Sequence, residues 1–567
     1  MAVNSRAGAI DTRACGRPHS PTLFILCLAL AGCGGESATY VARGPSPTGG
    51  VAYSGDGSEV ESDEAVYASS DTESVSTGAA AEESPSRPPP SPPPGVQPAP
   101  AAQMPTTPSE SGGGETYADT RENGLMDTRQ DAMSTFSLDV DTASYTLARS
   151  DLTAGRLPRP EGVRVEEWIN FFRYDDPAPT GGGAPFAVRV ESAPSYFGQA
   201  RHLLRVAVRA QEIPAAQRPA ANLVFLVDVS GSMGEANKLP LVQHALSQLV
   251  NSLRPDDTIG IVVYAGRQAT LLTPTAVSHR GEVLAAIESL TSGGSTNGEG
   301  GIRAAYDLAA QHFRRGGINR VVLCTDGDFN VGLTGDSLIH LIEQYRERDI
   351  TLTTLGFGRG NYNDRDMERL ADHGNGNYAY VDNRNEALRV LARDLSGTLQ
   401  VVAKDVKVQV EFDPAVVSHF RLIGYDNRVL RHRDFEDDTV DAAELGSGQF
   451  VTALLEYELQ PGVDPQQDPR ALAEVRVRYK QPTGRRSQLL RQTFHLNEGH
   501  AQFGQGSDAF RFCAAVAEFA EIMRHSSHSE GARFEDVRRV VSRTHFGQTP
   551  DGRELSALLT RAQSIWH

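Results

Sequence analysis

The sequence predicts an α/β domain with a doubly wound, mostly parallel sheet, inserted into a β-sandwich-like domain. A helical C-terminal region and a disordered N-terminal tether complete the predicted chain. Near-continuous apolar runs in the middle of the chain are typical of strands covered on both faces. Stretches with alternating apolar and polar residues lie on both sides of that block and indicate strands with one buried face. The N-terminal part lacks the bulky apolar side chains that a core needs.

Length and charge narrow the class of protein further. The chain has 567 residues, which is too long for one hydrophobic core, and a net charge of −18. Ten acidic residues and one arginine lie between Glu36 and Glu83, so about half of the net charge belongs to that segment. The acidic balance argues against nucleic acid as a partner, because phosphate binding needs clustered Lys and Arg. Five cysteines are too few for a disulfide framework.

The N-terminus is typical of a secretory signal peptide. The apolar run 22–31 is too short to span a bilayer, and it follows Arg6, Arg13 and Arg17. It ends in Leu-Ala-Gly-Cys, which resembles the lipobox of bacterial lipoproteins. The resemblance implies that residues 1–33 include a lipoprotein signal peptide and that Cys33 is lipidated. An ordinary signal peptide with an incidental cysteine is the alternative, and the long region before the run leaves the start codon open.

Residues 34–118 are predicted to form a disordered linker, acidic at first and then rich in proline. Eleven of the 32 prolines lie between Pro85 and Pro108, and such runs favour extended polyproline II. We interpret the segment as a spacer between a lipid anchor and a folded head, rather than as an SH3-type ligand.

The segment 119–180 is predicted to be mixed helix from Ser134 to Asp176, anchored on the body by Trp168, Phe171 and Phe172. The β-rich domain is expected over 181–220 together with 400–500. Its expected strands are 186–190, 204–208, 406–412, 451–459, 475–479 and 490–496.

The α/β domain is predicted to span 221–399. Its expected strands are 222–228, 258–264, 320–326 and 350–357. The first expected helix starts at Leu239, and the others are 280–290, 300–313, 336–348 and 386–399. Strands that alternate with helices predict a doubly wound sheet. The C-terminal region 501–567 is predicted to be helical.

Polar residues leave several of these strands at one edge of the predicted sheet. Open α/β sheets bind ligands at the carboxyl ends of their strands. The first strand ends in Asp228-Val-Ser230-Gly-Ser232, a later loop carries Thr296, and the next strand ends in Thr-Asp326-Gly. Carboxylate and hydroxyl oxygens from three loops are therefore expected at the same edge.

This pattern resembles the von Willebrand factor type A (VWA) domain over Ala221 to Leu399. The resemblance implies that Asp228, Ser230, Ser232, Thr296 and Asp326 form a metal-ion-dependent adhesion site. The turn Leu355-Gly-Phe-Gly358 also fits the family. More narrowly, the chain resembles bacterial lipoproteins that carry this domain, with an N-terminal segment like 134–145 and a C-terminal region of uncharacterised function.

Oxygen ligands select hard cations, so Mg²⁺ is expected, with Mn²⁺ or Ca²⁺ possible on ligand type. Neutral hydroxyls leave such an ion much of its charge, and it would attract an acidic residue of a partner. The alternative is that these side chains only cap the helices that follow. Ser295 and Asp328 are the neighbours that could replace the assigned ligands.

Other motifs are weaker. Asp139-Val-Asp141-Thr142 hints at a phosphotransferase motif, but a capping or turn role fits better. No helix follows the glycines of 356–360 as dinucleotide binding requires. His525 and His528 lack a third ligand, and Cys324 lies in a core strand as an inert thiol. Ser230 has no visible base, so the sequence does not predict an enzyme.

These observations predict a lipid-anchored envelope protein whose VWA domain binds a protein partner through a divalent cation. We expect the outer membrane if the cell has two, because Gly34 is not the aspartate associated with inner-membrane retention. The side of the membrane stays open. Two alternatives remain: an accessory subunit of an enzyme or ATPase-linked assembly, and a structural envelope protein with a purely stabilising metal.

Overall fold

The structure is a computed structural model that describes residues 117, 121–180, 183–197, 201–294, 298–327, 335–360, 362–394, 397 and 399–566. Cys33, the predicted signal peptide and nearly all of the predicted linker lie outside the described residues. Thr296, Ser295 and Asp328 lie outside them as well. Within the described ranges, every helix is too short or too polar to cross a membrane.

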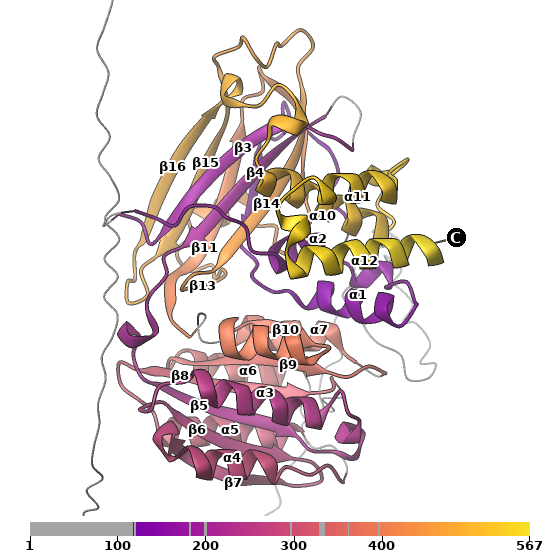
Figure 1. The fold of residues 1–567 in the computed structure, drawn as a ribbon. Coiled ribbons are helices and arrows are strands. Elements are labelled where there is room, and N and C mark those ends of the chain that lie inside the picture. Colours follow the sequence, from indigo (N-terminus) through magenta and orange to yellow (C-terminus); the bar gives the residue numbers. More distant parts are fainter. Residues whose placement is uncertain are drawn as a thin grey trace, which may run out of the picture. The chain divides into compact units, whose positions relative to one another are not determined.

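Two antiparallel sheets form the β domain (Figure 1). The first has the order β1 (Met126–Asp127), β12 (Val417–Ile423), β14 (Phe450–Leu459), β4 (His202–Ala210) and β3 (Phe186–Pro194). The second has the order β13 (Leu445–Gly446), β11 (Val401–Phe412), β15 (Ala471–Lys480) and β16 (Ser487–His495), and β2 (Met133–Ser137) also pairs with β11. Alternate residues of both sheets share one core, in which the ring centroids of Phe412 and Phe420 are 4.9 Å apart. The predicted sandwich is confirmed.

A six-stranded sheet forms the α/β domain. Its order is β10 (Tyr378–Val381), β9 (Ile350–Phe357), β8 (Ile318–Thr325), β5 (Ala221–Asp228), β6 (Thr258–Tyr264) and β7 (Gln268–Ala276), and only β7 is antiparallel to its neighbour. One core packs α3 (Leu239–Ser252), α4 (Arg280–Glu288) and the turns α8 (Arg384–Ala387) and 388–394 on the sheet. The other packs α5 (Gly298–Gln311), α6 (Gly335–Arg346) and α7 (Asp364–His373). Helices on both faces confirm the doubly wound fold.

The α/β domain is inserted in the β domain, as predicted. Strand β4 of the sandwich ends at Ala210, and the chain enters the α/β sheet at Ala221. It returns to the sandwich at Val401, the first residue of β11.

The N-terminal segment and the C-terminal helices share a third core beside the sandwich. It contains α1 (Ala143–Thr153), α2 (Val165–Phe171), α10 (Asp508–Met523), α11 (Phe534–Ser542) and α12 (Pro550–Ile565). Trp168 is 1 % exposed, and its ring centroid lies 5.2 Å from that of Phe519 in α10. The predicted anchors Trp168, Phe171 and Phe172 are therefore buried as expected.

The prediction of helix from Ser134 onward was wrong over its first residues. Residues 134–137 belong to β2 and pair with Val410 to Lys407 of β11. This short segment is a strand because it pairs with β11, which lies more than 250 residues later in the chain. The local sequence pattern does not indicate that pairing.

Replacing Trp168 by alanine should destabilise the compact unit Pro105–His567 by ~3–5 kcal/mol, because it leaves a large cavity between α2 and α10. Urea unfolding followed by fluorescence and circular dichroism would measure the loss. Leu489→Ala on β16 is the control, since that side chain is 39 % exposed and its loss should cost no more than about 0.5 kcal/mol. Equal effects of the two substitutions would contradict the assigned core.

Candidate functional site

Asp228 is the last residue of the central strand β5 and is fully buried. Its Oδ1 accepts the backbone N–H of Ser230 at 2.8 Å. Its Oδ2 accepts the hydroxyls of Tyr264 and Thr325, each at 3.1 Å. These two donors end the neighbouring strands β6 and β8, so the carboxylate is oriented from both sides.

The two serines of the motif lie next to each other on the loop that follows. Ser230 and Ser232 have their Oγ atoms 3.0 Å apart; Ser230 is buried and Ser232 is exposed. The neighbouring loop is held against them, because the N–H of Gly231 donates to the carbonyl of Gly294 at 3.0 Å. Gly294 has a φ of +89°, a conformation that favours glycine. This loop leads toward Thr296, which lies outside the described residues.

Asp326 follows β8 and is 2 % exposed. Its Oδ2 accepts the ammonium of Lys238 at 3.1 Å, in an ion pair whose two side chains are both buried. The sequence interpretation did not include Lys238. The lysine lies just before α3, at a helix N-terminus where a positive charge is unfavourable, and this misplaced charge is the signal that could have identified it.

The described residues fit a hard divalent cation. The donor set consists of two buried carboxylates and two adjacent hydroxyls, all oxygen. Burial raises the pKa of Asp228, and the negative charge of Asp326 raises it further. A positive group at this edge is therefore favourable, and the Lys238 ammonium already occupies such a position beside Asp326. Asp228, Ser230, Ser232 and Asp326 lie at or just after the carboxyl ends of β5 and β8.

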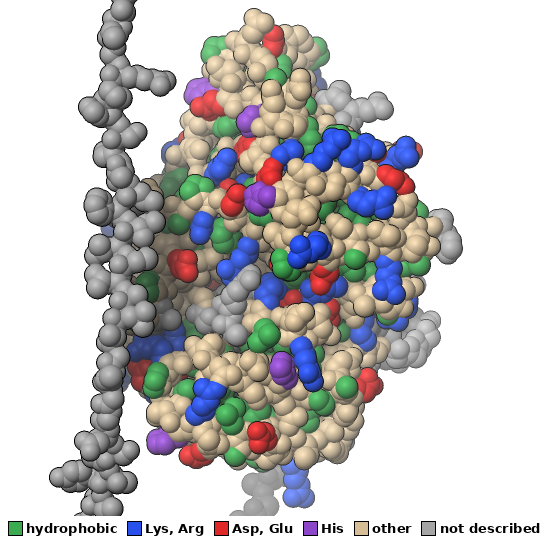
Figure 2. Space-filling view, viewed as in Figure 1, with side chains coloured by type: hydrophobic (Ala, Val, Ile, Leu, Met, Phe, Trp, Pro, Cys, Tyr) green, Lys and Arg blue, Asp and Glu red, His purple; other side chains and the backbone are tan. Residues whose placement is uncertain are grey.

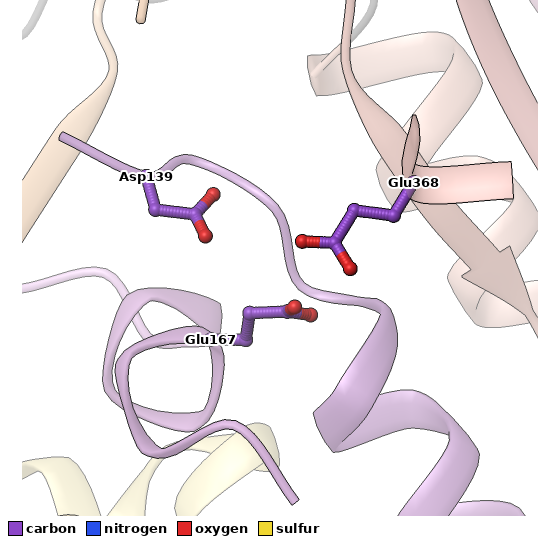
Figure 3. A group of neighbouring side chains, drawn as sticks. All are labelled: Asp139, Glu167 and Glu368. Atoms are coloured by element: carbon purple, nitrogen blue, oxygen red, sulfur yellow. The ribbon is translucent and has the colours of Figure 1, made fainter. Parts of the chain in front are cut away.

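A second group of acidic side chains lies where the α/β domain meets the rest of the chain. Asp139 precedes α1, Glu167 belongs to α2 and Glu368 belongs to α7, and their carboxylates point toward one another (Figure 3). One oxygen of each lies within 4.8 Å of the others, and all three residues are buried. Asp139 Oδ1 also accepts the N–H of Asp141 at 2.9 Å, which is the turn role expected for this motif.

Two arginines balance this acidic group. Arg428 contacts Asp139 at 3.2 Å and Glu368 at 3.1 Å, and Arg164 pairs closely with Glu167. A cavity of about 290 Å³ opens beside the group, lined in part by Asp139 and Arg428. Because each carboxylate faces a guanidinium, we interpret the group as an ion network that joins α7 to the N-terminal segment and the sandwich.

Each of the remaining sequence motifs packs against other parts of the protein. Cys324 is fully buried, and burial raises the pKa of its thiol, as expected for an inert residue. The His525 ring lies 4.9 Å from that of Trp566, whereas His528 lines a small cavity near Glu518. Gly358 follows β9 and lies against the side chain of Lys238. On the face drawn in Figure 2, hydrophobic side chains of the described residues form only small, separate patches.

Comparison with known proteins places these features in a family. Residues 222–393 match the family described as "von Willebrand factor type A domain", and residues 111–205 match "von Willebrand factor". Residues 397–565 match "Uncharacterized protein YfbK, C-terminal". The "Uncharacterized protein YfbK" of Escherichia coli K12 is 39 % identical over 473 residues, which cover 80 % of this chain and 81 % of the relative. The chain belongs to the YfbK family.

Two other similarities are more distant. An uncharacterized protein of Synechocystis is 25 % identical over 292 residues, covering 51 % of this chain and 68 % of the relative. A solved von Willebrand factor type A structure from Catenulispora acidiphila has a TM-score of 0.39 and 14 % identity, covering 68 % of this chain and 91 % of that chain. The VWA domain assigns this YfbK-family chain to a class of generally non-enzymatic modules that mediate protein–protein interaction.

Glu166, a buried residue of α2 that senses the charge of Asp139 in the ion network, predicts a pH dependence of stability. Burial, with the charges of Asp139 and Asp426, raises the pKa of Glu166 from 4.5 to about 7. Between these values the folded state binds more protons, so the free energy of unfolding falls as pH rises through this window. Glu166→Gln removes the charge, and a side-chain oxygen can still accept the N–H of Tyr425. The stability difference between variant and wild type should grow by roughly 2–3 kcal/mol from pH 4.5 to 8.

Urea unfolding of the unit Pro105–His567 at several pH values would measure this difference. Titrating groups that do not interact with Glu166 are common to both proteins, so their effects cancel in the comparison. A difference that stays constant with pH would contradict the raised pKa of Glu166.

Proposed function

We propose that this chain is a lipid-anchored envelope protein whose VWA domain binds a protein partner through a divalent cation. The observation that carries the proposal is the convergence of Asp228, Ser230 and Ser232 with Asp326 at the carboxyl edge of the sheet. Mg²⁺ suits this donor set, and Mn²⁺ or Ca²⁺ share its preference for oxygen.

Each residue has a distinct task in this proposal. The hydroxyls of Ser230 and Ser232, with that of Thr296 from the next loop, would provide neutral ligands. Asp228 is held by three hydrogen bonds, so it provides a fixed negative charge at the base of the site. Ser232 is exposed, which leaves that side of the site open to a partner. The bound cation would supply the positive charge that attracts an acidic side chain of the partner.

The N-terminal sequence supports the proposed location. A lipidated Cys33 would anchor the chain in the cell envelope, and the linker 34–118 would separate the folded head from the membrane. We propose the outer membrane where the cell has two.

Capture experiments test the proposed metal-dependent binding of a protein partner. Full-length chain in detergent should retain a protein from an envelope extract in Mg²⁺ and lose it in EDTA. The variant Ser230→Ala/Ser232→Ala should lose the same protein in Mg²⁺, because two cation ligands are missing. Mass spectrometry of the eluates would compare the captures.

The matched control is Ser247→Ala/Ser252→Ala, which removes two hydroxyls from α3 that bond within the helix. This control should capture the partner like wild type. Capture of the same proteins in all conditions would contradict metal-dependent binding of the partner. A lower melting temperature in EDTA with unchanged capture would instead favour a purely stabilising metal.

The anchor has its own test. Cells that express the full chain should incorporate a labelled fatty acid into it, and Cys33→Ser should abolish the label and release the protein from membranes. Cys27→Ser, within the apolar run of the signal peptide, should retain both properties. Labelling of the Cys33 variant would contradict the assigned lipid site.

A further inference from the structure

Lys238 is a charged group at the candidate metal site that the ligand pattern does not include. It lies six residues after Ser232 and is 4 % exposed. Its ammonium donates to Asp326 Oδ2 at 3.1 Å, so one of the predicted cation ligands already holds a positive partner. A buried lysine is costly unless it is paired, and this one is paired with a carboxylate of the metal site.

The path of the lysine side chain is fixed by its surroundings. A Cβ at Gly358 would overlap the Cγ and Cε atoms of Lys238, so the aliphatic stem lies directly against this glycine. Gly358 has a φ of +72°, and its carbonyl accepts the hydroxyl of Tyr380 at 2.7 Å. The backbone of Lys238 is also held, because its carbonyl accepts the N–H groups of Leu241 and Val242. The ammonium is therefore directed at Asp326 by packing, and not by chance rotation on the surface.

We infer that Lys238 is a built-in competitor of the divalent cation, which sets the metal concentration at which the site fills. This inference rests on the proposed function. The ammonium engages one oxygen of Asp326 and places a positive charge beside the site. A cation that approaches Asp326 must either displace the ammonium or bind against its repulsion.

The charges of the described residues extend the inference to the partner. Asp228 and Asp326 carry two negative charges and Lys238 carries one positive charge. Addition of a divalent cation leaves a net charge of +1, which one carboxylate neutralises. Lys238 thus makes metal binding weak in the free protein and stronger when a partner offers an acidic side chain. Cation and partner would bind cooperatively.

The test measures metal binding in the absence of any partner. Full-length chain in detergent is titrated with Mn²⁺ at constant pH and salt, and the free ion is followed by electron paramagnetic resonance. Lys238→Met, which keeps an unbranched apolar stem, should bind Mn²⁺ at least about tenfold more tightly than wild type. Lys238→Arg keeps the positive charge and is the matched control, expected to bind like wild type.

A second variant covers the case in which Lys238→Met fails to fold. Lys238→Gln keeps a polar side chain but is shorter and carries no charge, and it should bind Mn²⁺ several-fold more tightly than wild type. For each folded neutral variant, Mn²⁺ should raise the melting temperature by more than it does for wild type.

The outcomes separate the two proposals. If wild type and the neutral variants bind Mn²⁺ equally, or the variants bind more weakly, Lys238 is not a competitor and the inference is overturned while the metal site stands. If no protein binds Mn²⁺ at millimolar concentration, the proposed function fails and the inference fails with it. The inference is supported if the neutral variants bind Mn²⁺ more tightly than wild type while Lys238→Arg does not.

Discussion

The candidate site depends on the way Asp228 is held at the end of the central strand. Parallel pairing places Tyr264 beside Asp228, and Val227 beside Cys324, so that Thr325 follows on the other side. Both hydroxyls donate to the same carboxylate oxygen. A slip of one residue in either strand would turn these side chains to the opposite face. Because both faces of the sheet are buried against helices, the packing that defines the register also defines the site.

A continuous set of contacts connects this site to the segment before the sandwich. The Thr146 hydroxyl in α1 donates to the carbonyl of Tyr380 at 2.8 Å, and the Tyr380 hydroxyl donates to Gly358. Arg359, the next residue, pairs with Asp151 of α1 at 2.5 Å. Gly358 in turn supports the stem of Lys238. The N-terminal segment therefore packs against the residues that support Lys238 at the candidate site. These contacts are consistent with its place in the same compact unit as the α/β domain.

The sequence predicts those elements whose burial produces a periodic pattern. Strands β5, β6, β8 and β9 are apolar runs buried on both faces, and their bounds agree with the prediction to within two residues. Within the α/β domain, three elements were missed for identifiable reasons. Most of β7 is exposed, so its residues show no buried face. Helix α7 reads DRDMERLADH, in which charged residues join the ion network and obscure the apolar stripe. Strand β10 has only four residues, too few to show a period.

The carboxylates of the site were predictable from spacing, but their counter-ion was not, because Lys238 and Asp326 are 88 residues apart. This difference bears on how the domain folds. Two carboxylates buried together would cost several kcal/mol if nothing balanced them. Here a backbone N–H orients Asp228 and an ammonium is paired with Asp326, so both buried carboxylates have partners within the protein. Under the proposed function, a cation that enters this site would compete with the Lys238 ammonium for Asp326.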